Sequence, residues 1–283
     1  MSIQVTPTDA ALGARIEGVD LTKPLDEATF QQVRSAFYEH EVVYFRGEPL
    51  SEEDHIRFSA RFGELRRLKL DQLHAQHPEI FVVSNIMEEG KHIGAYDAGI
   101  FWHTDGAYLK NPHAISALRA LEVPVKDGRV LGDTVYSSMS AAYDALSTCM
   151  KQRLEGLQAL QSIIHRHQKT LQSGSKKEYS AAIKADPEAV HPVVRVHPVT
   201  GRKCLYVSEG YTVSVLGLPE DESKDLIAEL TDHIAKREFH YVHNWRAHDL
   251  VMWDDCSTQH KATFDYALPL RRLMHRTTVI NGL

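Results

Sequence analysis

The sequence predicts a mostly β protein with flanking helices, built around a double-stranded β-helix (jelly-roll, cupin-like) core. From Pro78 onward, short apolar runs alternate with turn residues, which is typical of a β-sandwich or barrel. The sequence contains no internal repeat and no Pro/Gly-rich linker between its helical and β-rich parts. With 283 residues, 43% of them hydrophobic, the chain is long enough to bury one large core. We therefore expect one domain with helices packed on its outside.

The first quarter of the chain predicts two helices and three strands. Asp26 can cap a helix over Asp26–Glu39, where apolar residues recur every three or four positions. Ser51 can cap a second helix that ends near Gly63, because glycine readily adopts the conformation that follows a helix. The expected strands in this region are Ile3–Thr6, Ala14–Leu21 and Val42–Phe45.

The rest of the chain predicts the β core together with three more helices. These helices are expected over Ser140–Leu146, Cys149–Leu157 and Asp221–Lys236. Gln168–Ala185 is polar and predicts a mobile loop. The expected strands are Ile80–Val83, Ala114–Leu121, Thr134–Tyr136, Leu160–His165, Val193–His197, Cys204–Val207, Glu238–Tyr241, Leu250–Trp253 and Leu273–Ile280.

The composition excludes several classes of function. Lys and Arg number 32 against 38 Asp and Glu, so the net charge of −6 offers no general attraction for nucleic acid or anionic membranes. The sequence has no apolar run of about 18 residues, and its N-terminus lacks the features of a signal peptide. The three cysteines have no C-x-x-C spacing and predict reduced thiols in a cytoplasmic protein. The 17 histidines supply many potential metal ligands.

The segment Trp102–Asp105 carries the most informative pattern. On an extended strand, His103 and Asp105 would face the same side and could bind one ion. A distant third ligand would complete a 2-His-1-carboxylate triad, a site typical of non-haem Fe(II) oxygenases. With this composition, chance alone gives about two H-x-[DE] matches. The sequence has two, the second being His77 and Glu79, so spacing alone does not choose between them.

The surrounding sequence distinguishes the two H-x-[DE] matches, because Trp102–Asp105 is the first of five motifs in a fixed order. They are W-H-T-D at Trp102–Asp105, G-D-T at Gly132–Thr134, G-R-K-C-L-Y-V at Gly201–Val207, W-D-D-C-S-T-Q-H at Trp253–His260 and R-R-L-M-H-R-T-T at Arg271–Thr278. Together these motifs resemble those of the TauD/TfdA (taurine dioxygenase) family of Fe(II)- and 2-oxoglutarate-dependent dioxygenases. The resemblance extends from about residue 18 to 280.

The resemblance implies a role for each matching residue. His103, Asp105 and His260 would be the catalytic iron ligands, where O2 and 2-oxoglutarate also bind. Thr134 and Arg272 would hold the distal carboxylate of 2-oxoglutarate, and a plain strand threonine is the alternative for Thr134. The resemblance further implies one domain over residues 1–283, with a lid-forming insert between about 145 and 190. It also implies a homo-oligomer, either a dimer or a tetramer.

Arg276 stands where family members meet the anionic group of their primary substrate. A structural ion pair with an acidic residue is the alternative for this side chain. Arg272 and Arg276 would share one face of a strand, so they could reach adjacent anions, and arginine forms bidentate bonds to carboxylates. We therefore expect a small organic acid, a sulfonate or sulfate, or an amino-acid derivative as substrate.

The substrate pocket departs from that of the taurine enzyme. Leu68 and Asp71 replace a histidine and a tyrosine that contact taurine, and Gly99 lies near the position of a missing polar residue. Gly106 and Tyr206 complete the candidate substrate-binding residues, with core packing as the alternative for Tyr206. Small and apolar residues here predict a bulkier or less polar substrate than taurine.

Three further side-chain groups have more ordinary interpretations. Trp102 and Trp253 are expected to form pocket wall. His165-Arg166-His167 is expected in a lid or on the surface, and His77 with Glu79 is expected to be structural.

Two other classes of function use the same residues. A zinc-dependent hydrolase could use the His/Asp/His site, but it would need no dicarboxylate anchor such as Thr134 with Arg272. A non-catalytic cupin-like binding protein would be expected to lose metal ligands. The sequence favours the dioxygenase and leaves open the substrate and the position that is oxidised.

Overall fold

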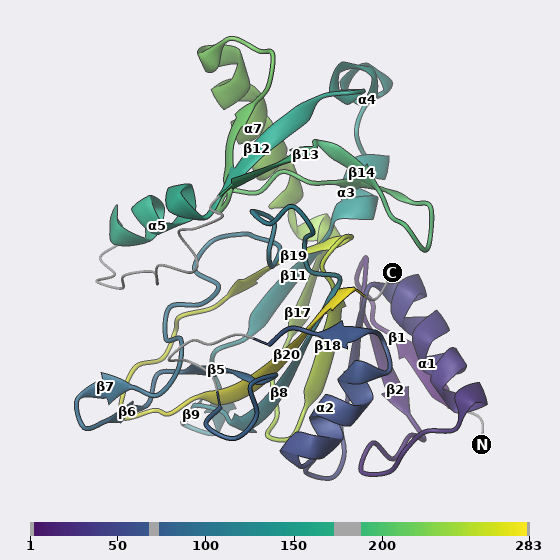
Figure 1. Cartoon of the computed structure of the whole chain (residues 1–283), viewed down its shortest axis with the longest axis vertical. Coiled ribbons are helices and arrows are strands. Elements are labelled where there is room, and N and C mark those ends of the chain that lie inside the picture. Colours follow the sequence, from purple (N-terminus) through teal and green to yellow (C-terminus); the bar gives the residue numbers. More distant parts are fainter. Residues whose placement is uncertain (1–2, 68–73, 173–187, 282–283) are drawn as a thin grey trace.

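The computed structural model describes residues 3–67, 74–172 and 188–281, and its core consists of two facing β-sheets, as in a jelly roll (Figure 1). The larger sheet is built from β1 (Gln4–Pro7), β2 (Ala14–Glu17), β3 (Val42–Phe45), β18 (Leu250–Asp254), β8 (Ile115–Glu122), β20 (Leu273–Asn281) and β4 (Glu64–Leu65) in this order, and β5 (Phe81–Ser84) also pairs with β20. The smaller sheet has the order β17 (His240–His243), β11 (Thr134–Ser138) and β19 (Thr258–Ala262). The predicted fold class is confirmed.

Strand β18 shows how the sequence distributes its side chains between the two faces of the larger sheet. Val251 and Trp253 point to the smaller sheet, where the Trp253 ring packs against Tyr136 of β11 with centroids 5.6 Å apart. Leu250 and Met252 point to the opposite face. Because successive side chains of a strand alternate, one apolar run fills two separate cores.

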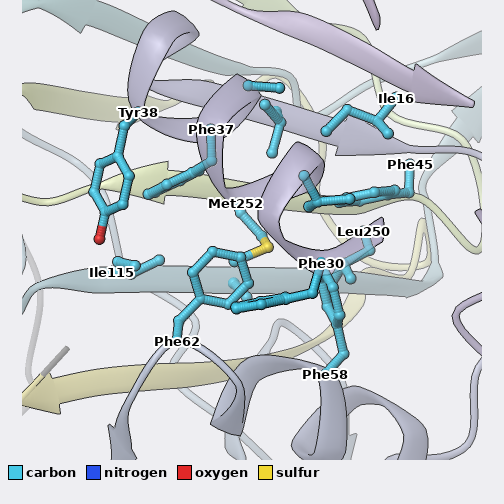
Figure 2. Close-up of a cluster of buried hydrophobic side chains, with 14 of the residues drawn as sticks. Ile16, Phe30, Phe37, Tyr38, Phe45, Phe58, Phe62, Ile115, Leu250 and Met252 are labelled. Carbon is cyan, nitrogen blue, oxygen red and sulfur yellow. The ribbon is translucent and has the colours of Figure 1, made fainter. Parts of the chain in front are cut away.

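Helices α1 (Glu27–His40) and α2 (Glu52–Ala60) cover the outer face of the larger sheet (Figure 1). As predicted, the Asp26 side chain caps α1 by accepting the Thr29 N–H at 2.8 Å. Figure 2 shows Phe30 and Phe37 of α1 gathered with Phe62, and the rings pack edge to face at 5.1 and 5.6 Å. This aromatic cluster holds the helices against the sheet and leaves the opposite face for the site.

The elements between the two halves of the core gather at one end of the molecule, at the top of Figure 1. A three-stranded sheet with the order β13-β12-β16 packs there against α7. The elements are α3 (Met139–Asp144), α4 (Thr148–Leu154), β12 (Gln158–Ser162), α5 (Ile163–Gln172), β13 (Glu188–Pro192), β14 (Val194–Val196), β15 (Lys203–Leu205), β16 (Thr212–Val215), α7 (Glu220–Ile234) and the short 3-10 helix η1 (Arg237–Phe239). The single domain and its lid-forming insert stay predictions.

Two sequence expectations near α5 are wrong. Leu160–His165 was expected to be one strand, but β12 ends at Ser162. The Ser162 hydroxyl accepts the N–H groups of Ile164 and His165 at 3.2 and 3.3 Å, so it caps a helix at this position. Gln168–Ala185 was expected to be a loop, but α5 continues to Gln172, and residues 173–185 lie outside the described ranges.

Other strands differ from expectation in position or were not expected. Strand β17 begins at His240, because η1 occupies the residues before it. Strands β13, β16 and β19 had no predicted counterpart, and neither did the short hairpins β6 (Met87–Glu88) with β7 (Lys91–His92) and β9 (Val125–Lys126) with β10 (Arg129–Val130). Within the described ranges, no helix has the length and apolar character needed to cross a membrane.

Candidate active site

The three predicted metal ligands come together in the structure. Potential ligand atoms of His103, Asp105 and His260 lie within 4.8 Å of one another, and all three residues are buried. The Nε2 atom of His103 is 3.8 Å from Oδ1 of Asp105, and the two imidazole rings have centroids 4.2 Å apart. Residues separated by more than 150 positions thus form one compact site.

The loop that carries His103 is attached directly to the strand that carries His260. His103 donates its N–H to the His260 carbonyl at 3.3 Å, and His260 returns a bond of 2.9 Å. The extended conformation considered for His103 and Asp105 is not observed, because His103 forms only an isolated bridge and Asp105 lies in the turn that follows. The turn still brings the carboxylate back beside the imidazole.

The link between β18 and β19 is held by Asp254. Its Oδ1 accepts the N–H groups of Cys256 and Ser257 at 2.8 and 3.1 Å, and its Oδ2 lies 2.7 Å from His197 Nε2. All four residues are buried. This hydrogen-bonded turn positions β19, and with it His260, at the site.

Both site histidines are held in the form that binds a metal. The Nδ1–H of His103 donates to the Phe101 carbonyl at 2.8 Å, so the Nε2 lone pair is left for a ligand role. Burial and the nearby Arg166 charge hold the pKa of His103 well below its usual range. Burial also lowers the pKa of His260 to about 4. Both imidazoles are therefore neutral at pH 7.

Asp105 is held ionised by its surroundings. Burial favours a higher pKa, but the Arg276 guanidinium and both site histidines keep the pKa of this carboxyl well below its usual range. Arg276 Nη1 donates to Oδ2 at 2.7 Å, and the Ser116 hydroxyl donates to the same oxygen at 3.2 Å. These bonds occupy Oδ2 and leave Oδ1 beside His103.

Asp255 supports the site, although the sequence assigned it no role. Its Oδ2 lies 2.8 Å from the Ser116 hydroxyl oxygen, to which the neutral carboxyl can donate, and its Oδ1 accepts from Trp253 Nε1 at 2.9 Å. Burial and the neighbouring Asp105 charge raise the pKa of Asp255 well above its usual range, so it is the neutral partner of the two carboxyls. In the sequence, the position of Asp255 in the W-D-D motif could have indicated this role.

Thr134 and Arg272 both lie beside Trp245. The indole N–H of Trp245 donates to the Thr134 hydroxyl at 3.1 Å, and the Arg272 guanidinium lies 5.9 Å from the Trp245 ring centroid. Arg272 is 4% exposed and its side chain hydrogen-bonds to Tyr266, but its Nε has no hydrogen-bond partner and it makes no ion pair with any carboxylate of the described chain. Burial lowers its pKa. A buried guanidinium without an anion is costly, so this position favours an anionic ligand.

Arg276 pairs with Asp105 in the structure, which is the ion-pair alternative considered for it. Its guanidinium also lies over the Phe81 ring, 4.9 Å from the centroid, and its Nε is buried without a hydrogen-bond partner. The predicted contact between Arg276 and the substrate stays a prediction.

The remaining candidate substrate residues fall into three groups. Gly99 and Gly106 lie in the site loops with φ of 88° and 71°, where a side chain would be strained. Tyr206 is buried in a small apolar cluster with Tyr108 and Tyr211. Leu68 and Asp71 lie outside the described residues.

The other marked residues can also be placed. Trp253 packs on His260 at 4.8 Å, whereas Trp102 packs on His240. His77 and Glu79 take part in ion pairs with Glu53 and Arg67, in agreement with a structural role. Of the two positions expected for His165-Arg166-His167, the surface is wrong for Arg166, which is buried with its guanidinium 5.0 Å from the Tyr211 centroid, and the lid stays a prediction.

The free energy of unfolding is expected to fall as the pH drops from about 6.5 towards 4. Burial lowers the pKa of His260 to about 4, and those of His55 and His113 to about 3, from the ordinary 6.5. The unfolded chain binds these protons near pH 6.5, whereas the folded chain binds them only near pH 4 or below. Acidification between these values therefore favours the unfolded chain, so the contribution of these histidines to the free energy of unfolding is complete above pH 6.5 and falls below it. Glu41, whose pKa burial raises to about 6, and Asp255, whose pKa lies well above its usual range, oppose the trend with one proton each, whereas His275, with a pKa lowered to about 4, adds to it. Urea titrations of the metal-free protein at about pH 7.5, 6 and 5 measure the effect, and a constant unfolding free energy would contradict it.

The jelly-roll core, with a buried His/Asp/His cluster between its sheets, defines a dioxygenase-type site. The comparisons with known proteins agree. The family model described as taurine catabolism dioxygenase TauD, TfdA family, matches residues 4–278. The chain belongs to this family, and the predicted enzyme class, a dioxygenase of the TauD/TfdA type, is confirmed.

Named relatives resemble the chain along its whole length. Pentalenolactone F synthase of Streptomyces arenae is 33% identical, covering 98% of this chain and 95% of its own. The alpha-ketoglutarate-dependent 2,4-dichlorophenoxyacetate dioxygenase of Cupriavidus pinatubonensis is 32% identical and covers 99% of both. The second of these relatives acts on a small molecule, 2,4-dichlorophenoxyacetate.

Solved structures agree with the fold. A taurine dioxygenase from Burkholderia xenovorans superposes with a TM-score of 0.82 at 32% identity, covering 99% of this chain and 90% of its own. AAD-2, solved in complex with Mn(II) and N-oxalylglycine, superposes with a TM-score of 0.80 at 28% identity, covering 99% and 97%.

Proposed function

We propose that this enzyme is an Fe(II)- and 2-oxoglutarate-dependent dioxygenase that oxidises a small anionic organic substrate. The reaction would consume O2, 2-oxoglutarate and a substrate C–H bond, and would yield succinate, CO2 and a hydroxylated, cleaved or desaturated product. The observation that carries this proposal is the buried Arg272 guanidinium, which has no carboxylate partner in the described chain and shares Trp245 as a neighbour with Thr134.

The residues present fit the iron. Two neutral imidazoles and one ionised carboxylate are the donor set that suits Fe(II) and leaves coordination positions for other ligands. The Phe101 carbonyl orients His103, and Arg276 with Ser116 orients Asp105, so the ligands are held before the metal arrives. When bound, the iron would supply the oxygen chemistry, and the chain would supply orientation and a site from which water is excluded.

The residues present also fit 2-oxoglutarate. Arg272 would form charge-assisted bonds to the distal carboxylate, and the Thr134 hydroxyl would donate to the same group. AAD-2 was crystallised with N-oxalylglycine, and the Cupriavidus relative is named for its dependence on alpha-ketoglutarate. A zinc hydrolase has no use for such an anchor, so this pair favours the dioxygenase over that alternative.

The substrate is proposed to be an organic acid, a sulfonate or sulfate, or an amino-acid derivative, with its anionic end near Arg276. Beside the guanidinium lies the Phe81 ring, which would suit an apolar body attached to the anionic group. The Cupriavidus relative, which acts on a phenoxyacetate, supports this substrate class.

The cellular context is part of the proposal. All three cysteines are free, two of them buried, which suits a reducing compartment such as the cytoplasm. We propose a cytoplasmic homo-oligomer, a dimer or tetramer, by analogy with relatives.

Anaerobic titration with Fe(II) and 2-oxoglutarate tests the function. A weak visible charge-transfer band is expected when both are bound, followed by slow release of succinate after oxygen is admitted. No band, or no succinate, would contradict the proposal. Zinc-dependent ester hydrolysis without a band would favour the hydrolase, and absence of any turnover would favour a binding protein.

A further inference from the structure

His113 is a buried histidine beside the site, and no motif drew attention to it. It lies just before β8 and is 3% exposed, and neither of its ring nitrogens has a hydrogen-bond partner. A buried polar group without a partner is costly and calls for an explanation. Burial lowers the pKa of His113 to about 3, so the ring is neutral and can both donate and accept a hydrogen bond.

Gly106 makes room for this imidazole next to the metal-ligand loop. A Cβ atom on residue 106 would lie 2.8 to 3.0 Å from Cγ, Cδ2 and Nδ1 of His113, which is closer than real Cβ contacts. The backbone at Gly106 also has φ of 71°, a conformation that favours glycine. The His113 ring therefore takes the space that a side chain directly after Asp105 would occupy.

Two arginines act on the same imidazole. After burial, the charges of Arg66 and Arg276 are what keep the pKa of His113 low, while Asp105 opposes them. Arg66 is fixed at the end of the larger sheet by its N–H bond of 2.8 Å to the Thr278 carbonyl. The Arg66 side chain makes no ion pair with the part of the chain that is described. The imidazole thus feels the charges of two guanidinium groups and one carboxylate, a net positive charge around a neutral donor.

We propose that His113, together with Arg66 and Arg276, forms the subsite that receives the anionic group of the primary substrate, and that His113 determines specificity for it. The inference rests on the proposed function and deepens it. The substrate class is a carboxylate, sulfonate or sulfate on an apolar body, because the Phe81 ring lies against Arg276. Such an anion would accept a bond from the imidazole N–H and so satisfy one of its two unpartnered nitrogens.

The test compares the binding of phenylacetate, benzenesulfonate and neutral phenylacetamide to the protein loaded anaerobically with Fe(II) and 2-oxoglutarate. The wild type is expected to bind at least one of the two anions more tightly than the amide. His113→Leu is expected to weaken that anion about tenfold with little effect on the amide, and His113→Gln should retain most of the affinity. Gly106→Ala, which would displace the imidazole, should reproduce the loss without altering His113 itself, and an unchanged charge-transfer band in this variant shows that the neighbouring Asp105 still serves the metal site.

His55→Leu is the matched control. His55 is also fully buried with a pKa of about 3, but it contacts Thr277 on the opposite face of β20. Its anion affinity should equal that of the wild type. The inference is overturned if the wild type binds neither anion, or if His113→Leu and Gly106→Ala both bind them normally. Absence of the charge-transfer band in the wild type would instead overturn the proposed function.

Discussion

Replacing His103 with alanine is expected to abolish Fe(II) binding at micromolar metal and to lower succinate formation by about a thousandfold or more. The substitution removes one of three buried ligands, and the remaining His260 and Asp105 offer too few donors for a stable site. It also leaves Asp105 next to Arg276, so the carboxylate stays paired and the fold should persist. Equilibrium dialysis of Fe(II) and the charge-transfer band measure the loss.

The sequence offers a matched control in its second H-x-[DE] match. His77 lies 3.5 Å from Glu53, while Glu79 pairs with Arg67, and both pairs involve exposed side chains. His77→Ala should therefore leave Fe(II) affinity and succinate formation within about twofold of the wild type, because exposed ion pairs contribute little. If His77→Ala lost iron, or His103→Ala kept it, the assigned metal site would be wrong.

Local signals in the sequence predicted the parts of the fold that local chemistry controls. The Asp26 cap, the capping box of Ser51 with Asp54, and the apolar run of β18 all depend on residues close together in the chain. The resemblance to the family then supplied the distant pairing of the His103 loop with His260, which spacing alone did not determine. That is why the candidate ligands could be named from sequence.

Strand β19 could not be predicted for a physical reason. Its sequence, Thr258–Ala262, contains no apolar run, so nothing local favours an extended conformation. It is extended because it pairs along its length with β11, where Tyr136 lies opposite His260, and because His103 bridges its other edge. Tertiary pairing overrode weak local propensity here.

Arg166, Asp255 and His113 were missed or misplaced for a related reason. Their roles depend on burial against residues far away in the chain: Tyr211 for Arg166, Asp105 for Asp255, and Gly106 with Arg276 for His113. A charged or polar residue in a sequence is expected at the surface. The packed structure shows that these three residues are buried. In a buried position, a charge or a nitrogen without a hydrogen-bond partner is costly and therefore indicates a role.

Arg272→Met is expected to raise the KM for 2-oxoglutarate by about a hundredfold or more, because loss of one partner of a buried charge pair costs about 2–5 kcal/mol. Its neighbour Arg271 is the matched control. Arg271 forms an ion pair of 3.2 Å with Glu122, and both side chains are about half exposed. Arg271→Met should change the KM by less than about twofold.

Thermal unfolding separates loss of the anchor from damage to the fold. Arg272 lies buried with a hydrogen bond to Tyr266 but no carboxylate partner in the described chain, so methionine removes a charge that no described carboxylate neutralises and should hold or raise the Tm of the protein without 2-oxoglutarate. In the wild type, 2-oxoglutarate at a hundred times its Kd should stabilise the fold by about 2.7 kcal/mol, and this gain should vanish in Arg272→Met. A variant that unfolds earlier and still responds fully to 2-oxoglutarate would mean that Arg272 is a structural residue. The opposite pair of results, a fold at least as stable and no response to the dicarboxylate, is expected if Arg272 serves to bind 2-oxoglutarate.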